Sequence, residues 1–301
     1  MKLFDDSVLK DAIDIHIHVG PDYNSRYADA ITLAEEARAA GMKAIVIKCH
    51  LQSTVMGAEA ANLLVPEVKT FGSLTLNDPT GGLSPRSVMA AVKTGAKVIW
   101  LPTVDSKWAM EKGKNGHWIG HYTNGSSFGY DSDRIWLTAL DENGNLKNEV
   151  KEIVNICQNN NIVLCSGHLG PNECIEIAKY ADSINYHHFE ITHANDWYDD
   201  FNLDVLRELA KYHATISLAF GGLTPHNGRQ DPKELVEIIH GVGADHCIMM
   251  TDFGQPNAPS PVEGFRVFYY LMKKYGITSN ELDLMMKKNP AKLLWIDKEG
   301  E

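Results

Sequence analysis

Two histidines, one residue apart, stand in an apolar segment near the start of the chain. The segment reads Asp14-Ile15-His16-Ile17-His18, and this alternation predicts a β-strand. Because successive side chains of a strand point to opposite faces, we expect Asp14, His16 and His18 on one face. Two adjacent buried imidazoles are costly unless a partner satisfies them, and a divalent cation bound to their neutral nitrogens does so. The strand is therefore predicted to form half of a metal site.

Polar residues at other strand ends complete this site if the strands form a barrel. In such a fold the carboxyl ends of the strands meet on one rim, where active sites lie. Beyond the first strand, the candidate groups at these ends are Lys48, Cys49 and His50 (second), His168 (fifth), His193 (sixth) and Asp252 (eighth). Nitrogen and oxygen donors without a set of thiolates suit a catalytic zinc, with manganese and ferrous iron as alternatives. A metal there would make water nucleophilic near neutral pH, and Asp252 could accept the proton.

The elements that must position these groups alternate regularly along the 301 residues. Apolar strand-like segments followed by amphipathic helical segments predict a parallel sheet with crossover helices. Eight such units favour an α/β fold made of one closed (β/α)8 barrel of the TIM type over an open sheet. The predicted strands cover residues 12–18, 43–49, 68–76, 97–102, 161–167, 188–193, 214–220 and 246–251.

Capping residues mark several of the predicted helices. Ser84 and Pro85 open one helix, Gly41 ends another, and Thr278 with Glu281 forms a possible capping box. Besides the helix that opens at Pro85, helices are predicted over 28–40, 148–159, 171–180, 203–212, 232–242, 261–275 and 279–288.

The stretch 104–135 breaks this rhythm, because it is long, polar and rich in aromatic residues. It would follow the fourth strand on the active-site face, so we expect a substrate loop or a small subdomain inserted in one domain that covers 1–301.

Composition narrows the class of partner. The net charge of −11 argues against nucleic acid and anionic membranes, and leaves a small molecule as the expected partner.

Five cysteines without a CxxC pair indicate reduced thiols, and the start of the chain lacks an apolar secretory region, so we expect a cytoplasmic protein. No apolar run approaches the ~20 residues of a membrane span. The aromatic insert and the helix at 261–275 are candidate surfaces for a homo-oligomer.

These motifs together resemble the amidohydrolase superfamily of metal-dependent barrel hydrolases. The resemblance rests on the HxH of the first strand, the histidines that end strands five and six, and the aspartate that ends strand eight. The segment Asn289-Pro290-Ala291-Lys292-Leu293-Leu294 is similar to the NPA-(K/R)-LL sequence that often closes these domains. The resemblance implies that His16, His18 and Asp252 hold one metal ion, and that His168 and His193 hold a second ion or contact the substrate.

The sequence departs from the two-metal members of that superfamily at the fourth strand. Many of them end this strand with a carbamylated lysine that bridges the metals, whereas this chain has Trp100-Leu101-Pro102-Thr103. Lys48 shares a face with Ala44, Val46 and His50. It could be a carbamylated ligand, a substrate-binding cation or an electrostatic partner of Asp252. The number of metal ions, one or two, therefore remains open.

Loop residues supply candidates for substrate binding. They are Arg26, His50, His121, Tyr122 and Arg229, of which the arginines could bind a carboxylate or phosphate in a bidentate manner. Alternation in the sixth strand turns His193 inward and predicts that Glu190 points outward toward the helices.

The expected activity is hydrolysis of a small amide, cyclic amide, ester or lactone, with Asp252, Lys48 and His193 as catalytic residues. The alternatives are a metal-assisted decarboxylase or other lyase, a phosphoesterase, and a catalytically silent barrel that serves as a binding module. Against a phosphoesterase of the histidinol-phosphatase type, the second strand ends in Lys48-Cys49-His50 rather than in TDH.

Overall fold

Short apolar strands form the centre of the protein in a computed structural model that describes residues 5–113, 136–196, 200–225 and 230–296. Every hydrogen-bonded strand pair among them is parallel. The strands are β1 (Ile13–His18), β2 (Ala44–Lys48), β3 (Lys69–Phe71), β4 (Ser73–Thr75), β5 (Val98–Trp100), β6 (Val163–Cys165), β7 (Phe189–Ile191), β8 (Thr215–Ala219) and β9 (Cys247–Met250).

β3 and β4 are two halves of one predicted strand, interrupted at Gly72. A Cβ at Gly72 would lie 2.6 Å from the Cα of Val55, so the close approach of another backbone requires glycine here. The strands therefore occupy eight positions, in the order β1-β2-β3 and β4 to β9. Beyond β9, the amide of Asp252 donates to the His16 carbonyl (3.1 Å), and the amide of His18 donates to the Phe253 carbonyl (2.7 Å). These bonds join the segment after β9 to β1. The predicted α/β barrel is confirmed.

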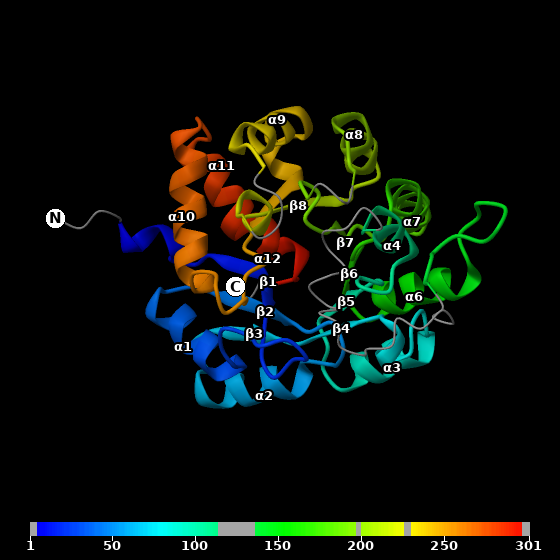
Figure 1. Cartoon of the computed structure of the whole chain (residues 1–301), viewed down its shortest axis with the longest axis horizontal. Helices are drawn as coiled ribbons and strands as arrows, with labels where there is room; N and C mark the ends of the chain where they lie inside the picture. Colours follow the sequence, from blue (N-terminus) through cyan, green and yellow to red (C-terminus); the bar gives the residue numbers. More distant parts are fainter. Residues whose placement is uncertain (1–4, 114–135, 197–199, 226–229, 297–301) are drawn as a thin grey trace.

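Helices surround the strands (Figure 1). All the predicted helices are present, although the last one ends early as an α-helix. The structure adds α2 and α4, neither of which was predicted, and α4 lies at the start of the predicted insert. The sequence of α2 places apolar side chains on both faces, and Met56 and Leu63 are exposed. The helices around the strands are α1 (Ala30–Ala39), α2 (Val55–Leu64), α3 (Pro85–Lys93), α4 (Lys107–Gly113), α6 (Asn148–Asn159), α7 (Pro171–Ser183), α8 (Leu203–Lys211), α9 (Pro232–Val242) and α10 (Pro261–Lys274).

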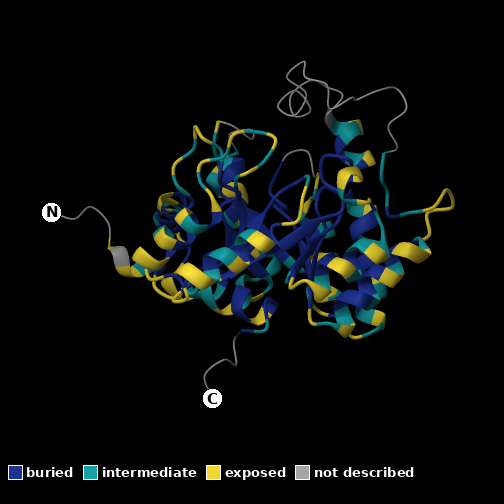
Figure 2. Cartoon of the chain, turned by 90° about the horizontal axis from the view of Figure 1, so that it is seen from below, coloured by how far each residue is buried: buried dark blue, intermediate teal, exposed yellow. Residues whose placement is uncertain are grey.

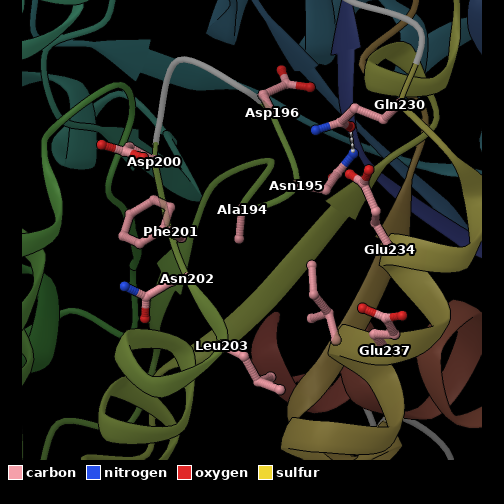
Figure 3. A pocket seen from close by; sticks show the side chains of 11 residues that line it. Ala194, Asn195, Asp196, Asp200, Phe201, Asn202, Leu203, Gln230, Glu234 and Glu237 are labelled. Atoms are coloured by element: carbon pink, nitrogen blue, oxygen red, sulfur yellow. Dashed lines mark hydrogen bonds between the residues drawn. The ribbon is translucent and has the colours of Figure 1, made fainter.

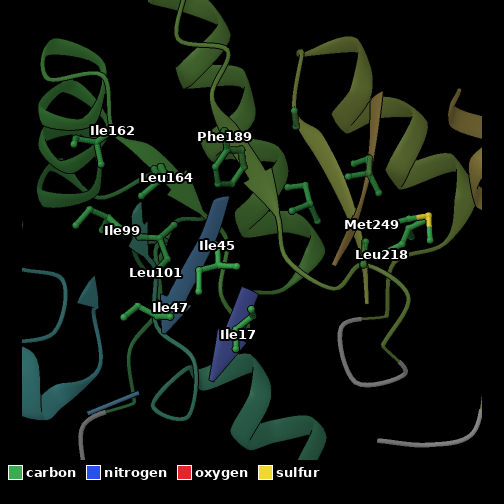
Figure 4. Close-up of a cluster of buried hydrophobic side chains, with 14 of the residues drawn as sticks. Ile17, Ile45, Ile47, Ile99, Leu101, Ile162, Leu164, Phe189, Leu218 and Met249 are labelled. Carbon is green, nitrogen blue, oxygen red and sulfur yellow. The ribbon is translucent and has the colours of Figure 1, made fainter. Parts of the chain in front are cut away.

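Two apolar clusters fill the molecule, and the buried residues lie mainly at its centre (Figure 2). The larger cluster lies between strands and helices and includes Ile45, Ile47 and Phe189 (Figure 4). The smaller one fills the barrel and includes Val46 and Trp100. Because β-strand side chains alternate, β1, β2, β5, β6, β8 and β9 contribute to both clusters.

The strict alternation predicted for β1 is wrong. Ile13 and Ile15 pack in the inner cluster, whereas Ile17 packs in the outer one. The pairing of β1 with β2 shifts register between Asp14 and Ile17, and such a bulge re-aims the side chains that follow it. After the bulge Ile17 points outward into the larger cluster, although Ile13 and Ile15 before it point into the barrel.

The C-terminal segment closes the end of the barrel at which the strands begin. It consists of α11 (Ser279–Asp283), the π-helical turn η5 (Leu284–Lys288) and α12 (Asn289–Leu293), where a single helix over 279–288 was predicted. The capping box of Thr278 and Glu281 is confirmed. The side chain of Asn289 donates to the carbonyls of Ala244 and Cys247 (2.8 and 2.7 Å), which holds α12 beneath the strands.

The five cysteines are buried free thiols, as predicted. None of the helices in the described part of the chain has the length and apolar character of a bilayer span. Of the predicted insert, residues 114–135 lie outside the described residues.

Candidate metal centre

His16, His18 and Asp252 meet at the carboxyl end of the barrel. The Nε2 atoms of His16 and His18 lie 3.1 and 3.0 Å from the same Asp252 oxygen, Oδ1. All three residues are buried, and their potential ligand atoms lie within 4.8 Å of one another. Two imidazole nitrogens and one carboxylate oxygen form the donor set of many catalytic zinc sites. These side chains therefore fit a divalent ion.

The backbone after β9 aims Asp252 at the histidines. Asp252 adopts a left-handed conformation (φ +56°), and Gly254 follows with φ +131°. A Cβ at Gly254 would lie 2.0 Å from the His18 carbonyl oxygen, so the loop passes β1 too closely for any side chain at this position. Such strain is typical of functional sites.

Three further imidazoles complete a ring of five. The ring centroids of His18 and His50 lie 4.9 Å apart, those of His50 and His168 6.1 Å, and those of His168 and His193 5.0 Å. The circuit closes between His193 and His16 at 5.9 Å. The predicted gathering of these histidines from separate strand ends thus appears in the structure.

Lys48 lies beneath this ring inside the barrel. Its Nζ is 3.1 Å from the Nε2 of His16 and 4.5 Å from the centre of the Trp100 ring. Trp100 itself packs against His16, with 4.6 Å between ring centroids. The aromatic side chain of the fourth strand position therefore contacts both His16 and Lys48.

Burial sets the protonation of these groups. Desolvation lowers the pKa values of His16, His50 and His168 well below the usual value and that of His193 to about 4, so their nitrogens are neutral at pH 7. Desolvation also lowers the pKa of Lys48 to about 8, and it outweighs the opposing attraction of Asp252. Neutral imidazoles keep a lone pair for a metal, and Lys48 titrates near physiological pH.

A polar network fixes the orientation of His50. The Nδ1 of His50 shares a hydrogen bond of 2.7 Å with the hydroxyl of Thr103, which accepts another from the amide of Asn77. The Asn77 amide also donates to the His50 carbonyl. Because the hydroxyl has one proton, this pattern favours its donation to Nδ1 and leaves the imidazole proton on Nε2.

Thr251 performs a similar positioning role beside Asp252. Its hydroxyl donates to Asp14 at 2.5 Å, and its amide donates to the same carboxyl group at 3.1 Å. Burial raises the pKa of Asp14 to about 7.

Sequence reasoning missed Thr103 and Asn77, which orient His50, because their roles depend on loops whose course periodicity does not reveal.

The prediction that Glu190 points toward the helices is wrong. Its neighbours Phe189 and Ile191 pack in the outer cluster, so Glu190 faces the barrel interior, where it accepts a hydrogen bond from Thr192 (2.7 Å). Burial raises its pKa. His193 reaches the centre as well because its backbone is left-handed (φ +34°), which breaks the assumed alternation.

A hollow of about 330 Å³ lies between the segment that follows β7 and the helix α9 (Figure 3). Asp196 lines it, and its Oδ2 lies 3.8 Å from the Nδ1 of His193. Asn195 and Gln230 point toward one another across it, joined by a hydrogen bond of 2.8 Å. The described residues that line the hollow include Asp196 but none of the five ring histidines and not Asp252.

The structure describes Arg26 and His50 among the predicted substrate-binding residues. The side chain of Arg26 is almost completely buried and forms an ion pair with Asp22, with its Nε 2.7 Å from the carboxylate. Its charge contributes to lowering the pKa of both Lys48 and His50. His121, Tyr122 and Arg229 lie outside the described residues.

Comparison with solved structures shows the same fold. An amidohydrolase from Pseudomonas aeruginosa is 13% identical, with a TM-score of 0.58 over 96% of this chain and 97% of that one. An organophosphorus hydrolase from Deinococcus radiodurans is 11% identical, with a TM-score of 0.58 over 95% and 93%. The dipeptidase AC, a metallopeptidase of family M19, is 11% identical, with a TM-score of 0.60 over 96% and 99%. The resemblance to the amidohydrolase superfamily is confirmed at the level of the fold.

Sequence comparison gives a separate result. A search of curated proteins finds no match to the chain. Residues 11–217 match the family described as a family of unknown function, DUF6282. This match spans β1 to β8 and includes His16, His18, His168 and His193. The chain therefore belongs to the DUF6282 family.

Proposed function

We propose that this protein is a metal-dependent hydrolase of small molecules. The observation that carries the proposal is the convergence of His16, His18 and Asp252 on one buried point, with His168 and His193 beside it. A divalent ion bound there, for which zinc best suits the nitrogen and oxygen donors, supplies Lewis acidity that makes a water molecule acidic near neutral pH.

The side chains around this point have distinct roles in the proposed reaction. Asp252 accepts the proton of the attacking water and returns it to the leaving group. Lys48 acts as the electrostatic partner of Asp252, since its ammonium group is buried and is stabilised by that carboxylate. His193 contacts the substrate or a second ion, and His50 donates a hydrogen bond from Nε2 to the substrate. Arg26, held by Asp22, contributes positive charge.

The proposed substrates are small amides, cyclic amides, esters and lactones. A carbonyl group suits this site because an imidazole donor and a buried cation can stabilise the negative charge that develops on its oxygen. We place His121, Tyr122 and Arg229 among the residues that select the substrate.

Trp100 favours one second candidate, a metal-assisted decarboxylase or other lyase. With tryptophan in place of a bridging lysine on the fourth strand position, the site suits a single ion. Product analysis separates the two reactions: hydrolysis incorporates one oxygen from labelled water into the product, whereas decarboxylation releases carbon dioxide.

The test is an activity screen of metal-loaded protein across amides, lactones and phosphoesters, repeated with Asp252→Asn and His16→Ala. Each substitution should lower kcat/KM for the best substrate by at least about 10³-fold. Asp252→Asn removes the group that accepts the proton, and His16→Ala removes a ligand of the metal. The exposed His240 on α9 provides the control, and His240→Ala should retain full activity. Unchanged turnover in Asp252→Asn, with the fold intact by circular dichroism, would refute the proposal.

A further inference from the structure

A second cluster of histidine and carboxylate lies at the other end of the barrel, where helices lead into strands. Asp182 stands in the last turn of α7, and His187 follows in the connection to β7. His213 lies in the connection from α8 to β8. Because β7 and β8 are paired, with Glu190 opposite Thr215, the residues that precede the two strands are neighbours. The pairing therefore brings His187 and His213 together.

The three side chains have the spacing of ligands to one ion. The Nε2 of His187 lies 3.4 Å from the Oδ1 of Asp182, and the Nε2 of His213 lies 3.8 Å from the same oxygen. The two imidazole centroids are 4.3 Å apart. Around a tetrahedral zinc with bonds of about 2.0 to 2.2 Å, neighbouring ligand atoms are about 3.3 to 3.5 Å apart. Small side-chain movements would bring all three groups to these distances.

The backbone of His187 is held in place by its neighbours. Tyr186 is buried, and its hydroxyl is hydrogen-bonded to the carbonyl of Ile162 and the amide of Leu164 (2.7 and 2.8 Å). His188 stacks on Trp295, with ring centroids 3.4 Å apart. His187 is thus fixed on both sides, and binding at its ring would require little ordering of the chain.

His213 is equally constrained. Its amide donates to the carbonyl of Ala210 at 3.0 Å, and its backbone is left-handed with φ +61°, a conformation that favours glycine or asparagine after a helix. The same left-handed conformation recurs at Asn161 and Asn185, where other helices lead into strands, so it fixes the course of the chain at His213.

Charge and access also favour a cation. The last turn of α7 contains Asp182 but no basic residue, so the carboxylate adds to the negative end of the helix dipole. The side chains of Asp182, His187 and His213 are 37%, 42% and 55% exposed, which leaves room for an ion and its water ligands. A hollow of about 390 Å³ adjoins His187 and His213, and Asp245, His246 and Lys292 also line it.

We propose that Asp182, His187 and His213 form a second metal site that binds a zinc ion and ties the α7–β7 connection to the α8–β8 connection. Imidazole nitrogens with one carboxylate oxygen suit zinc. This outer site is separate from the candidate metal centre, and it requires no catalytic activity.

Equilibrium dialysis of chelator-treated protein against zinc, followed by metal analysis, tests the outer site. His187→Ala/His213→Ala should bind one zinc ion fewer per chain than the wild type. His240→Ala, which removes an exposed histidine elsewhere, should bind as many as the wild type. In the His16→Ala/Asp252→Asn background, where the candidate metal centre is disabled, zinc should still bind and raise the unfolding temperature. Adding the two outer substitutions should weaken that binding at least about 100-fold and abolish the rise.

Equal zinc content in the wild type and in His187→Ala/His213→Ala would overturn the outer site. The same holds if zinc does not raise the unfolding temperature of the His16→Ala/Asp252→Asn protein. Failure of the proposed hydrolase activity would leave both results unaffected, because neither measurement depends on turnover.

Discussion

At the scale of single residues, the sequence allowed the gathering of five polar residues at the strand ends to be predicted, but not the side chains that hold them in place. His16, His18, His168, His193 and Asp252 could be named because each stands at the end of an apolar strand-like segment, and those ends meet in a barrel. Thr103 and Asn77 could not be assigned roles, and Glu190 was predicted to face the helices instead of the barrel interior. Their positions depend on a loop conformation and on a left-handed residue at 193, which alternation does not reveal.

Lys48 provides the sharpest prediction at this scale. Its ammonium group is buried, with a pKa lowered to about 8, so it is mostly protonated at pH 7 and loses its proton as pH rises through 8. Lys48→Met should lower kcat about 100-fold through lost electrostatic stabilisation. The wild-type kcat should fall above pH 8, and this fall should be missing from the profile of Lys48→Met.

The pH profiles of the two proteins, measured with one substrate, decide whether Lys48 acts through its charge. A Lys48→Met protein with wild-type kcat and the same decline above pH 8 would exclude this role. A wild-type kcat that depends on added bicarbonate would also contradict it, because such dependence indicates a carbamate.

At the scale of elements, the strands and most helices followed from periodicity, whereas irregularities did not. The helix α2 was missed because apolar residues lie on its exposed as well as its buried face. The bulge in β1 and the interruption at Gly72 depend on contacts with other segments, so no local pattern announces them. The bulge matters for function, since it accompanies the change in facing along the strand that carries His16 and His18.

Gly254 tests how the loop after β9 positions Asp252. Gly254→Ala would force a Cβ to within 2.0 Å of the His18 carbonyl oxygen, so the loop must move away from β1. We expect a loss of at least about 3 kcal/mol in the free energy of unfolding, together with loss of metal binding at His16 and His18.

Gly276→Ala is the matched control. Gly276 also has a left-handed backbone (φ +102°), but a Cβ there meets no atom within 4 Å. Its cost should be about 1 kcal/mol, since only the backbone preference changes. Similar losses for the two variants in denaturant titrations would show that the close approach to His18 is unimportant.

At the scale of the whole molecule, the eight repeated units were sufficient to predict the barrel, because each amphipathic helix must cover a strand whose other face is also buried. The substrate could not be predicted in the same way. Substrates are selected by the loops that follow the strands, such as the one that carries Asn195 and Asp196, and loop shape follows from contacts rather than periodicity.

The stability of the metal-free protein should fall in acid. The pKa of His193 is about 4 in the folded protein against 6.5 as its ordinary value, so between these values the unfolded chain binds more protons. Its contribution is fully present above pH 6.5 and is lost as pH falls toward 4, by up to about 3 kcal/mol. Denaturant titrations from pH 7.5 to 4 should therefore show a shallower decline for His193→Gln than for the wild type. Parallel declines would contradict this account.

The most direct test of the central claim is the metal content of protein purified without chelator. To exclude the outer site, the measurement is made on His187→Ala/His213→Ala, alone and combined with His16→Ala/His18→Ala. We predict at least one divalent ion per chain in the first protein and loss of that ion in the second, with both folded. A first protein without stoichiometric metal, or equal metal in the two, would contradict the account.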